Sequence, residues 1–366
     1  GTKREREPNL YALDRPFVRA TTSADASARS HIPAAVLNAA GIPGVPAENR
    51  CFAQLLNPEG LDVDYFVSHW WGHPFERTIK ALRNLAEAEH KRIGKKSPDE
   101  VVVWICLFAL NQHRAAEEVG STPEQGPFNA ALAKARFGAV MVLDDRAMPL
   151  VRIWCLFEVR RAADFGQPLR LVVDEGDVEQ ASTETLQAIG RRLRTLRAAE
   201  ASASNASDKN KIHFRVLDSA IRSMVPTFEF FLQMGAPPDY AFTDFDKHIC
   251  SLLGTPMLKA GLARGSAEIC SEALGMGAVA EVPELAYLRE ELGVNLAAKV
   301  ATRDGQCSLA VVFAGAGRVE ALRYALDHGA DFAAKDDTGY TALHAAARGG
   351  HAEACALLLE RGADPA

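Results

Sequence analysis

The stretch "DDTGYTALHAAARGGHAEACALLLERGADPA", residues 336–366, repeats features of the segment that precedes it. The Gly-Ala-Asp triplet at 329–331 returns at 362–364, and Ala325 aligns with Leu358, both at a spacing of 33 residues. A fixed period of this length is typical of proteins built by stacking copies of one supersecondary unit. Such a unit cannot bury its apolar face alone, so the sequence predicts stacked helix pairs.

The motif T-A-L-H at 341–344, within this period, resembles the ankyrin repeat. The resemblance implies that Thr341 and His344 lie in the turn that starts the first helix of a pair. It also implies that Gly350 lets the helix pair reverse. The residues expected to line the stacking face are Leu357, Leu358 and Leu359.

A weaker copy, "ELAYLREELGVNLAAKVATRDG", precedes the two clear repeats. Its Gly293 lies 36 residues before Gly329, which implies a three-residue insertion. We therefore expect two clear repeats and one degenerate repeat in an α-solenoid over 271–366. Because no polar capping repeat follows, we expect the stack to continue past residue 366. Generic helical hairpins are the alternative interpretation.

Upstream, apolar strands alternate with helical patterns, as in an α/β domain. The strands are apolar throughout, which predicts a parallel sheet covered by helices on both faces. The expected strands are 63–68, 101–110, 138–144 and 169–174, and the expected helices are 75–93, 127–137 and 154–166.

These patterns divide the chain into four parts. We expect an extended N-terminal arm over 1–60, an α/β domain over 61–180, a helical bridging segment over 181–270, and ankyrin repeats over 271–366. The chain is long enough for several separate cores.

Composition narrows the class of protein. The net charge of −6 and the lack of a basic stripe argue against nucleic-acid binding. The longest apolar run, 101–110, is half the length that a membrane-spanning helix needs. Seven scattered cysteines without a C-x-x-C pair predict neither zinc nor disulfides, and so favour a reducing, cytoplasmic location. The chain begins with glycine, so targeting by an upstream segment stays open.

Polar and aromatic residues follow the predicted strands, where ligands of parallel sheets bind. "SHWWGHPF" follows the first strand, "NQH" the second and "LDDR" the third, and a helix with Trp154 and Glu158 on one face comes next. The candidate ligand-binding residues are Ser68, His69, Trp70, Gly72, Gln112, His113, Asp144 and Trp154, with Glu158 as the candidate catalytic residue.

Residues 61–180 resemble a Toll/interleukin receptor (TIR) domain. The similar segments are "YFVSHWWG", "FNAALAKARFGAVMVLD", "RIWCLFEV" and "LRLVVDEGDVEQ", and the family's W-C-x-x-E helix is matched by Trp154, Cys155 and Glu158. The resemblance implies a flavodoxin-like parallel sheet and self-association. In TIR domains that cleave NAD, this glutamate is catalytic, which implies NAD as a substrate and no tightly bound cofactor. His73 and Pro74 depart from the acidic residue that often follows the loop glycine.

A second resemblance is to the fungal heterokaryon-incompatibility domain, itself considered a TIR relative. It rests on "SHWWG" and "VWICLFALNQH", similar to S-x-x-W-G and W-I-D-x-x-C-I-x-Q, with Leu107 near the family's acidic position. Both resemblances imply the same fold class.

The sequence thus favours an intracellular signalling or scaffold protein that binds a protein partner through its repeats and has a TIR-like domain able to cleave NAD. The alternative is a non-catalytic interaction or structural subunit in which Trp154 and Cys155 only pack the core. No metal site is predicted, because the spacing of His69, His73 and His113 matches no zinc motif.

Overall fold

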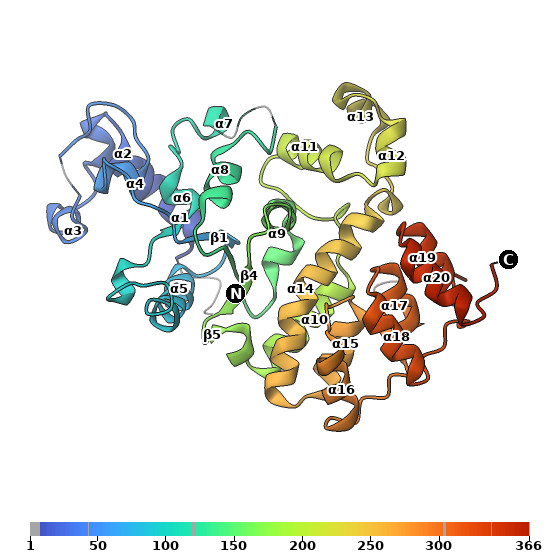
Figure 1. Cartoon of the computed structure of the whole chain (residues 1–366). Coiled ribbons are helices and arrows are strands. Elements are labelled where there is room, and N and C mark those ends of the chain that lie inside the picture. The colour runs from blue at the N-terminus through green and yellow to red at the C-terminus, as the bar shows by residue number, and fades with distance from the viewer. Residues whose placement is uncertain are drawn as a thin grey trace.

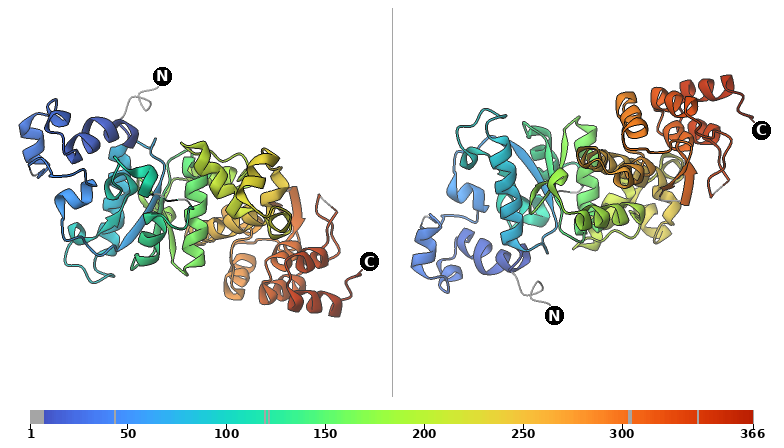
Figure 2. Two further views of the ribbon diagram at one scale, coloured as in Figure 1. Left: turned by 90° about the horizontal axis from the view of Figure 1, so that it is seen from above. Right: turned by 90° about the horizontal axis from the view of Figure 1, so that it is seen from below.

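An α/β sheet domain lies between a group of N-terminal helices and a C-terminal stack of helix pairs (Figures 1 and 2). The computed structural model describes residues 8–42, 44–118, 120, 122–302, 305–337 and 339–365. The N-terminal helices and the helix pairs lie at opposite ends of the molecule in every view (Figure 2).

The sheet has five strands in the order β2-β1-β3-β4-β5. The first four are parallel, in the order found in flavodoxin-like folds, which confirms the expected mostly parallel α/β sheet. The fifth strand instead pairs antiparallel with β4 through a tight turn, which Gly176 permits with φ of 129°. The strands are β1 (Tyr65–His69), β2 (Val103–Trp104), β3 (Ala139–Val142), β4 (Leu169–Val173) and β5 (Gly176–Asp177).

The second strand corrects the expectation for residues 101–110. Only Val103–Trp104 pair with β1, and the chain then forms the short helix α6 (Cys106–Ala109) with Leu107 fully buried. An apolar run alone cannot distinguish a buried strand from a buried helical turn. As a result, residues 111–113 follow a helix and do not lie at the end of a strand.

Helices cover both faces of the sheet. Val140 and Val142 of β3 pack with α5 (Phe75–Glu89), whereas Met141 points to the opposite face and packs with α9 (Ile153–Asp164). This alternation is the two-residue period of a strand. A third helix, α8 (Pro127–Lys134), covers the same face as α9. All three predicted helices are therefore present, α5 and α8 ending three or four residues earlier than expected.

From residue 8 onward, the N-terminal segment is not the extended arm that the sequence suggested, and residues 1–7 of that prediction lie outside the described residues. It folds into short helices that bury Leu10 and Val18 against the sheet domain, and the Thr21 and Thr22 hydroxyls donate to the carbonyl of Val18. Helices of one or two turns show no apolar periodicity, so the pattern could not reveal them. They are α1 (Leu10–Leu13), η2 (Asp14–Arg19), α2 (Ala20–Thr22), η3 (Ala26–Arg29), α3 (Ala34–Ala39) and α4 (Phe52–Leu56).

The segment after the sheet is helical, and its longest helix, α14 (Thr243–Arg264), joins the two halves of the molecule. One continuous apolar core includes Leu156 of α9, Leu253 of α14 and Leu322 of the repeats. The buried Asp246 accepts a hydrogen bond of 2.9 Å from the Ala198 amide. The remaining helices here are α10 (Thr183–Arg194), α11 (Ala206–Val216), α12 (Ser219–Met224), α13 (Phe228–Met234) and η7 (Asp239–Phe242). Short turns elsewhere are η4 (Pro98–Glu100), α7 (Ala115–Glu118), η5 (Met148–Val151) and η6 (Val178–Gln180).

The helix pairs of the repeats recur at the predicted spacing. The pair α17 (Leu309–Gly315) and α18 (Val319–Asp327) is followed by α19 (Ala342–Arg348) and α20 (Ala352–Glu360), each starting 33 residues later. The preceding pair is α15 (Ala267–Gly275) and α16 (Val282–Glu290). A hairpin of β6 (Lys299–Thr302) and β7 (Gly305–Ser308) separates it from α17.

Local details of the last repeat follow the expected roles with one correction. Thr341 and His344 form a capping box at the start of α19, and Gly350 has φ of 70° where the pair reverses. Leu357 and Leu358 are buried, but Leu359 is 47% exposed. Three consecutive helical residues span about 200° of the helix surface, so they cannot all face one neighbour.

Candidate functional site

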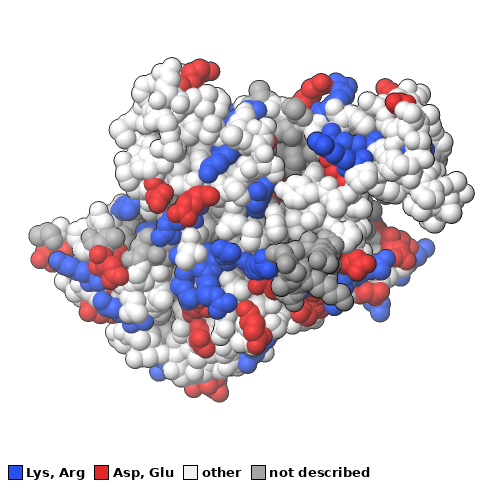
Figure 3. All heavy atoms as spheres, turned by 180° about the vertical axis from the view of Figure 1, so that it is seen from behind, with Lys and Arg blue, Asp and Glu red and all other residues white. Residues whose placement is uncertain are grey.

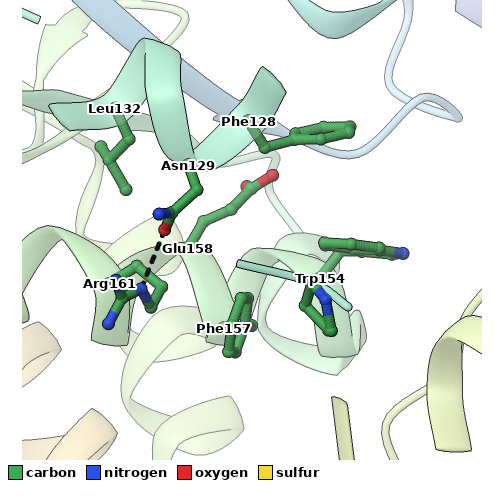
Figure 4. A pocket seen from close by; sticks show the side chains of 8 residues that line it. Phe128, Asn129, Leu132, Trp154, Phe157, Glu158 and Arg161 are labelled. Carbon is green, nitrogen blue, oxygen red and sulfur yellow. Dashed lines mark hydrogen bonds between the residues drawn. The ribbon is translucent and has the colours of Figure 1, made fainter. Parts of the chain in front are cut away.

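Helix α9 brings Trp154 and Glu158 to one face, as their spacing predicted. Both side chains line a small pocket between α8 and α9, together with Phe128, Asn129 and other residues of the two helices (Figure 4). In Figure 4 the Glu158 carboxyl lies beside the stacked rings of Phe128 and Trp154, while the guanidinium of Arg161 donates to Asn129 Oδ1 at 2.9 Å. The carboxyl is therefore left without a cationic partner among the described residues.

The aromatic residues around this carboxyl form a continuous row. The Trp154 indole stacks on Phe128 with ring centroids 5.2 Å apart, Phe128 meets Trp104 edge-on at 5.3 Å, and Trp104 stacks on Phe66 at 5.0 Å. Offset stacked and edge-on pairs are the favoured arrangements of aromatic rings. One face of the Trp154 ring is thus already covered by Phe128.

The pocket beside Glu158 is narrow. Its volume is about 10 Å³, the space that one water molecule needs. Sites that hold a drug-sized ligand are about 300–1,000 Å³. A nucleotide could reach the carboxyl only if α8 and α9 moved apart.

Burial controls the chemistry of Glu158, which is 8% exposed. Desolvation raises its pKa to about 8, and the nearby Ser68 hydroxyl offsets only part of this rise. The side chain is accordingly neutral at pH 7. Burial also raises the pKa of the neighbouring thiols, to about 12 for Cys106 and further for Cys155, so both are unreactive thiols at neutral pH.

The loop after β1 lies next to this carboxyl. The Cys155 thiol donates to the carbonyl of His69 at 3.6 Å, and the Ser68 hydroxyl lies close enough to the Glu158 carboxyl to lower its pKa. A Cβ atom on Gly72 would lie 2.2 Å from the Trp70 ring, so a larger residue there would have to displace that indole. Burial lowers the pKa of His69 to about 4, and this imidazole is neutral.

Three further candidates lie outside the pocket. Gln112 donates to the carbonyls of Cys106 and Leu107, and His113 Nε2 lies 3.0 Å from Thr22 Oγ1 in the N-terminal helices. Asp144 accepts from the Met148 amide at 2.6 Å and holds the turn before α9. Burial raises the pKa of Asp144. Each of these side chains is used in a local structural contact.

Metal-ligating side chains do not gather among the residues that the structure describes. Among residues 8–365 as far as they are described, no three His, Cys, Asp or Glu side chains are placed to hold an ion. The buried His73 Nδ1 lies 2.8 Å from the Thr78 hydroxyl, and its Nε2 lies 3.8 Å from Asp174.

A larger groove lies between α14 and the repeats, with a volume of about 740 Å³. One wall is α14, with Lys247 and His248, and the floor is formed by the small residues Gly315, Ala316 and Ala345 of α17 and α19. The T-A-L-H motif pointed to α19, but no sequence signal indicated that α14 would close the groove. The other polar residues that line it include Asp244, Ser251, Thr302, Arg318, Asp336, Tyr340, His344, Arg348 and His351.

The face that points away from the viewer in Figure 1 carries charged side chains of both signs, and Lys and Arg gather near its centre (Figure 3). In the basic run at the end of α10, Arg194 pairs with Glu272, and Arg192 donates to the carbonyl of Arg146 at 3.1 Å. At least two arginines of this run, Arg192 and Arg194, therefore form contacts with other parts of the fold.

Residues 308–359 match the family described as ankyrin repeats (many copies). The chain therefore carries ankyrin repeats, which imply protein binding, C-terminal to a mostly parallel α/β sheet domain whose family is unassigned. No curated protein matches the chain. Within the described residues, none of the helices is both long and apolar enough to cross a bilayer.

Proposed function

We propose that this chain is a signalling or scaffold protein that binds a segment of a partner protein in the groove between α14 and the repeat helices α17 and α19. The observation that carries this proposal is the size of the groove, about 740 Å³, which is within the range of functional ligand sites. Clustering through self-association of the α/β domain would be the output of partner binding.

The construction of the groove supports this role. Gly315 and Ala345 lie on facing helices, and a Cβ on Gly315 would be 3.3 Å from that of Ala345, so the floor is closely packed. Lys247, His248 and Arg348 stand above this floor on the walls. A bound segment that lies on this rigid floor can contact backbone groups of the floor and charged side chains of the walls at the same time.

Blocking the floor tests the proposal. Ala316 is exposed at the end of α17 and lines the groove, so Ala316→Trp fills the space without displacing core atoms. We expect proteins captured by the wild-type chain to bind at least about thirtyfold more weakly to this variant, since several contacts are lost together. Quantitative capture followed by titration of the captured proteins measures the effect.

The matched control is Ala347→Trp, which adds the same ring at an exposed position of α19 that does not line the groove. Equal loss of capture by both variants, or none by either, would contradict a partner site in the groove.

A second candidate function is cleavage of NAD at Glu158, favoured by a buried carboxyl that shares a pocket with two stacked aromatic rings. In this reaction the bond between nicotinamide and ribose breaks with its electron pair on the nicotinamide nitrogen. Water then adds to the ribose carbon and loses a proton. An ionised carboxylate stabilises the positive charge that develops on the ribose. Opening of the α8–α9 pocket, on clustering, would admit the nucleotide.

The enzymatic candidate makes a quantitative prediction. Clustered protein should release nicotinamide from NAD, and Glu158→Ala should lower the rate by at least about a hundredfold. Because the carboxyl pKa is about 8 in the closed state, the rate should rise with pH between 7 and 9. Chromatography of nicotinamide measures both effects, and an equal rate in the folded variant would exclude Glu158 from catalysis.

A further inference from the structure

We infer, resting on the protein-binding function proposed above, that the groove between α14 and the repeats selects an acidic segment of the partner. Three cationic side chains, Lys247, Arg318 and Arg348, line it against the two carboxylates Asp244 and Asp336. The chain as a whole has a net charge of −6, so the groove is a region of net positive charge in a negatively charged protein. Complementary charge at an interface supplies specificity and speeds association.

The cation on α18 is the one best placed to meet a ligand. Arg318 is exposed at the N-terminal end of α18 and has no ion partner in the described part of the chain. By contrast, Arg348 lies 3.5 Å from Asp244, which reduces the charge of both. A carboxylate arriving at Arg318 displaces no existing ion pair.

Three histidines lie on the same walls, and two of them, His248 and His344, can donate a hydrogen bond to a ligand. His344 Nδ1 lies 2.8 Å from the Thr341 hydroxyl, and His351 Nε2 lies 3.2 Å from the carbonyl of Gly315. His344 keeps its Nε2–H group for other contacts, and no hydrogen bond of His248 appears among the described residues, whereas His351 already donates its N–H group to the Gly315 carbonyl. Imidazole N–H groups pair readily with carboxylates.

The test uses the full chain and a fluorescein-labelled twelve-residue peptide of alternating Glu and Ser, with an alternating Gln and Ser peptide as its neutral match. We expect the Glu peptide to bind at least tenfold more tightly in anisotropy titrations at low salt. The double variant Lys247→Gln/Arg318→Gln should weaken it by about tenfold, as two exposed charge contacts would. Ala316→Trp should remove binding, and Arg323→Gln, an α18 arginine outside the groove lining, should leave it unchanged.

Two results would overturn the inference. Equal binding of the Glu and Gln peptides would show that the groove does not select an acidic segment. In that case the proposed protein-binding function would still stand if Ala316→Trp lost capture of partner proteins and Ala347→Trp did not. An oligothymidylate that binds more tightly than the Glu peptide, and is lost in Ala316→Trp, would assign the groove to nucleic acid.

Discussion

Glu158→Gln should raise the free energy of unfolding by about 4 kcal/mol at pH 8, because each tenfold change in an acid dissociation constant corresponds to about 1.4 kcal/mol. Burial raises the pKa of Glu158 from 4.5 to about 8, so the folded state binds the proton more tightly than the unfolded chain. The stabilisation from this proton is complete below pH 4.5 and is lost as the pH rises to about 8. Glutamine has the shape of the neutral acid and does not ionise, so the variant keeps its stability as the pH rises from 4.5 to 8.

The measurement is urea unfolding of wild type and variant at half-unit steps from pH 5 to 9. The difference between the two curves should grow with pH and level off above 8. His69 and His73, whose pKa values are lowered to about 4, act in the opposite direction below pH 6.5, but they are common to both proteins and cancel. Glu353→Gln, at an exposed position, should change stability by less than about 0.5 kcal/mol. A difference in stability that stays constant or shrinks as the pH rises would contradict a raised pKa of Glu158 in the fold.

Leu358→Ala should lower the stability of the repeats by about 3 kcal/mol, the usual cost of removing a fully buried leucine side chain. Leu358 has no exposed surface and belongs to the core that runs from α9 to the last helix pair. Since the repeats depend on their neighbours, loss of α20 packing should also loosen α19, which forms part of the groove floor. Hydrogen exchange of α18 to α20 amides measures this effect, and partner affinity should fall with it.

The neighbouring Leu359 provides the control. It lies on the same helix but is 47% exposed, so Leu359→Ala should cost less than about 1 kcal/mol and leave partner affinity unchanged. Equal destabilisation by the two substitutions would contradict the packing described for α20.

The repeats and the sheet could be predicted because their signals are local. The capping box of Thr341 and His344 and the 33-residue period are contained within single helix pairs. The apolar runs at 138–144 and 169–174 contain β3 and β4, which lie side by side in the sheet. In each case the residues that determine the element also lie within it.

Other elements depend on distant contacts that no pattern shows. Leu107 is buried in a helical turn although its neighbours form a strand-like run, because β2 pairs with β1 over only two residues. The short helices around Leu10 and Val18 are held by packing against the sheet domain. The order of elements could be read from the sequence, but these tertiary contacts could not.

The candidate site shows the same division. Helical spacing was enough to place Trp154 and Glu158 on one face, but the stacking of Phe128 on Trp154 brings together residues 26 positions apart. The expected place of Gln112 and His113 depended on a longer second strand and changed with it. Helix α14 forms a wall of the groove only because it packs near the repeats, which lie far from it in the sequence.

Hydrogen exchange of the full chain with and without its bound partner tests the central claim, that the groove is the binding site. We expect slower exchange over 243–251, 311–318 and 340–349 in the complex, and no change of this kind in Ala316→Trp. Protection confined to the sheet domain, with these three segments unchanged, would contradict the account.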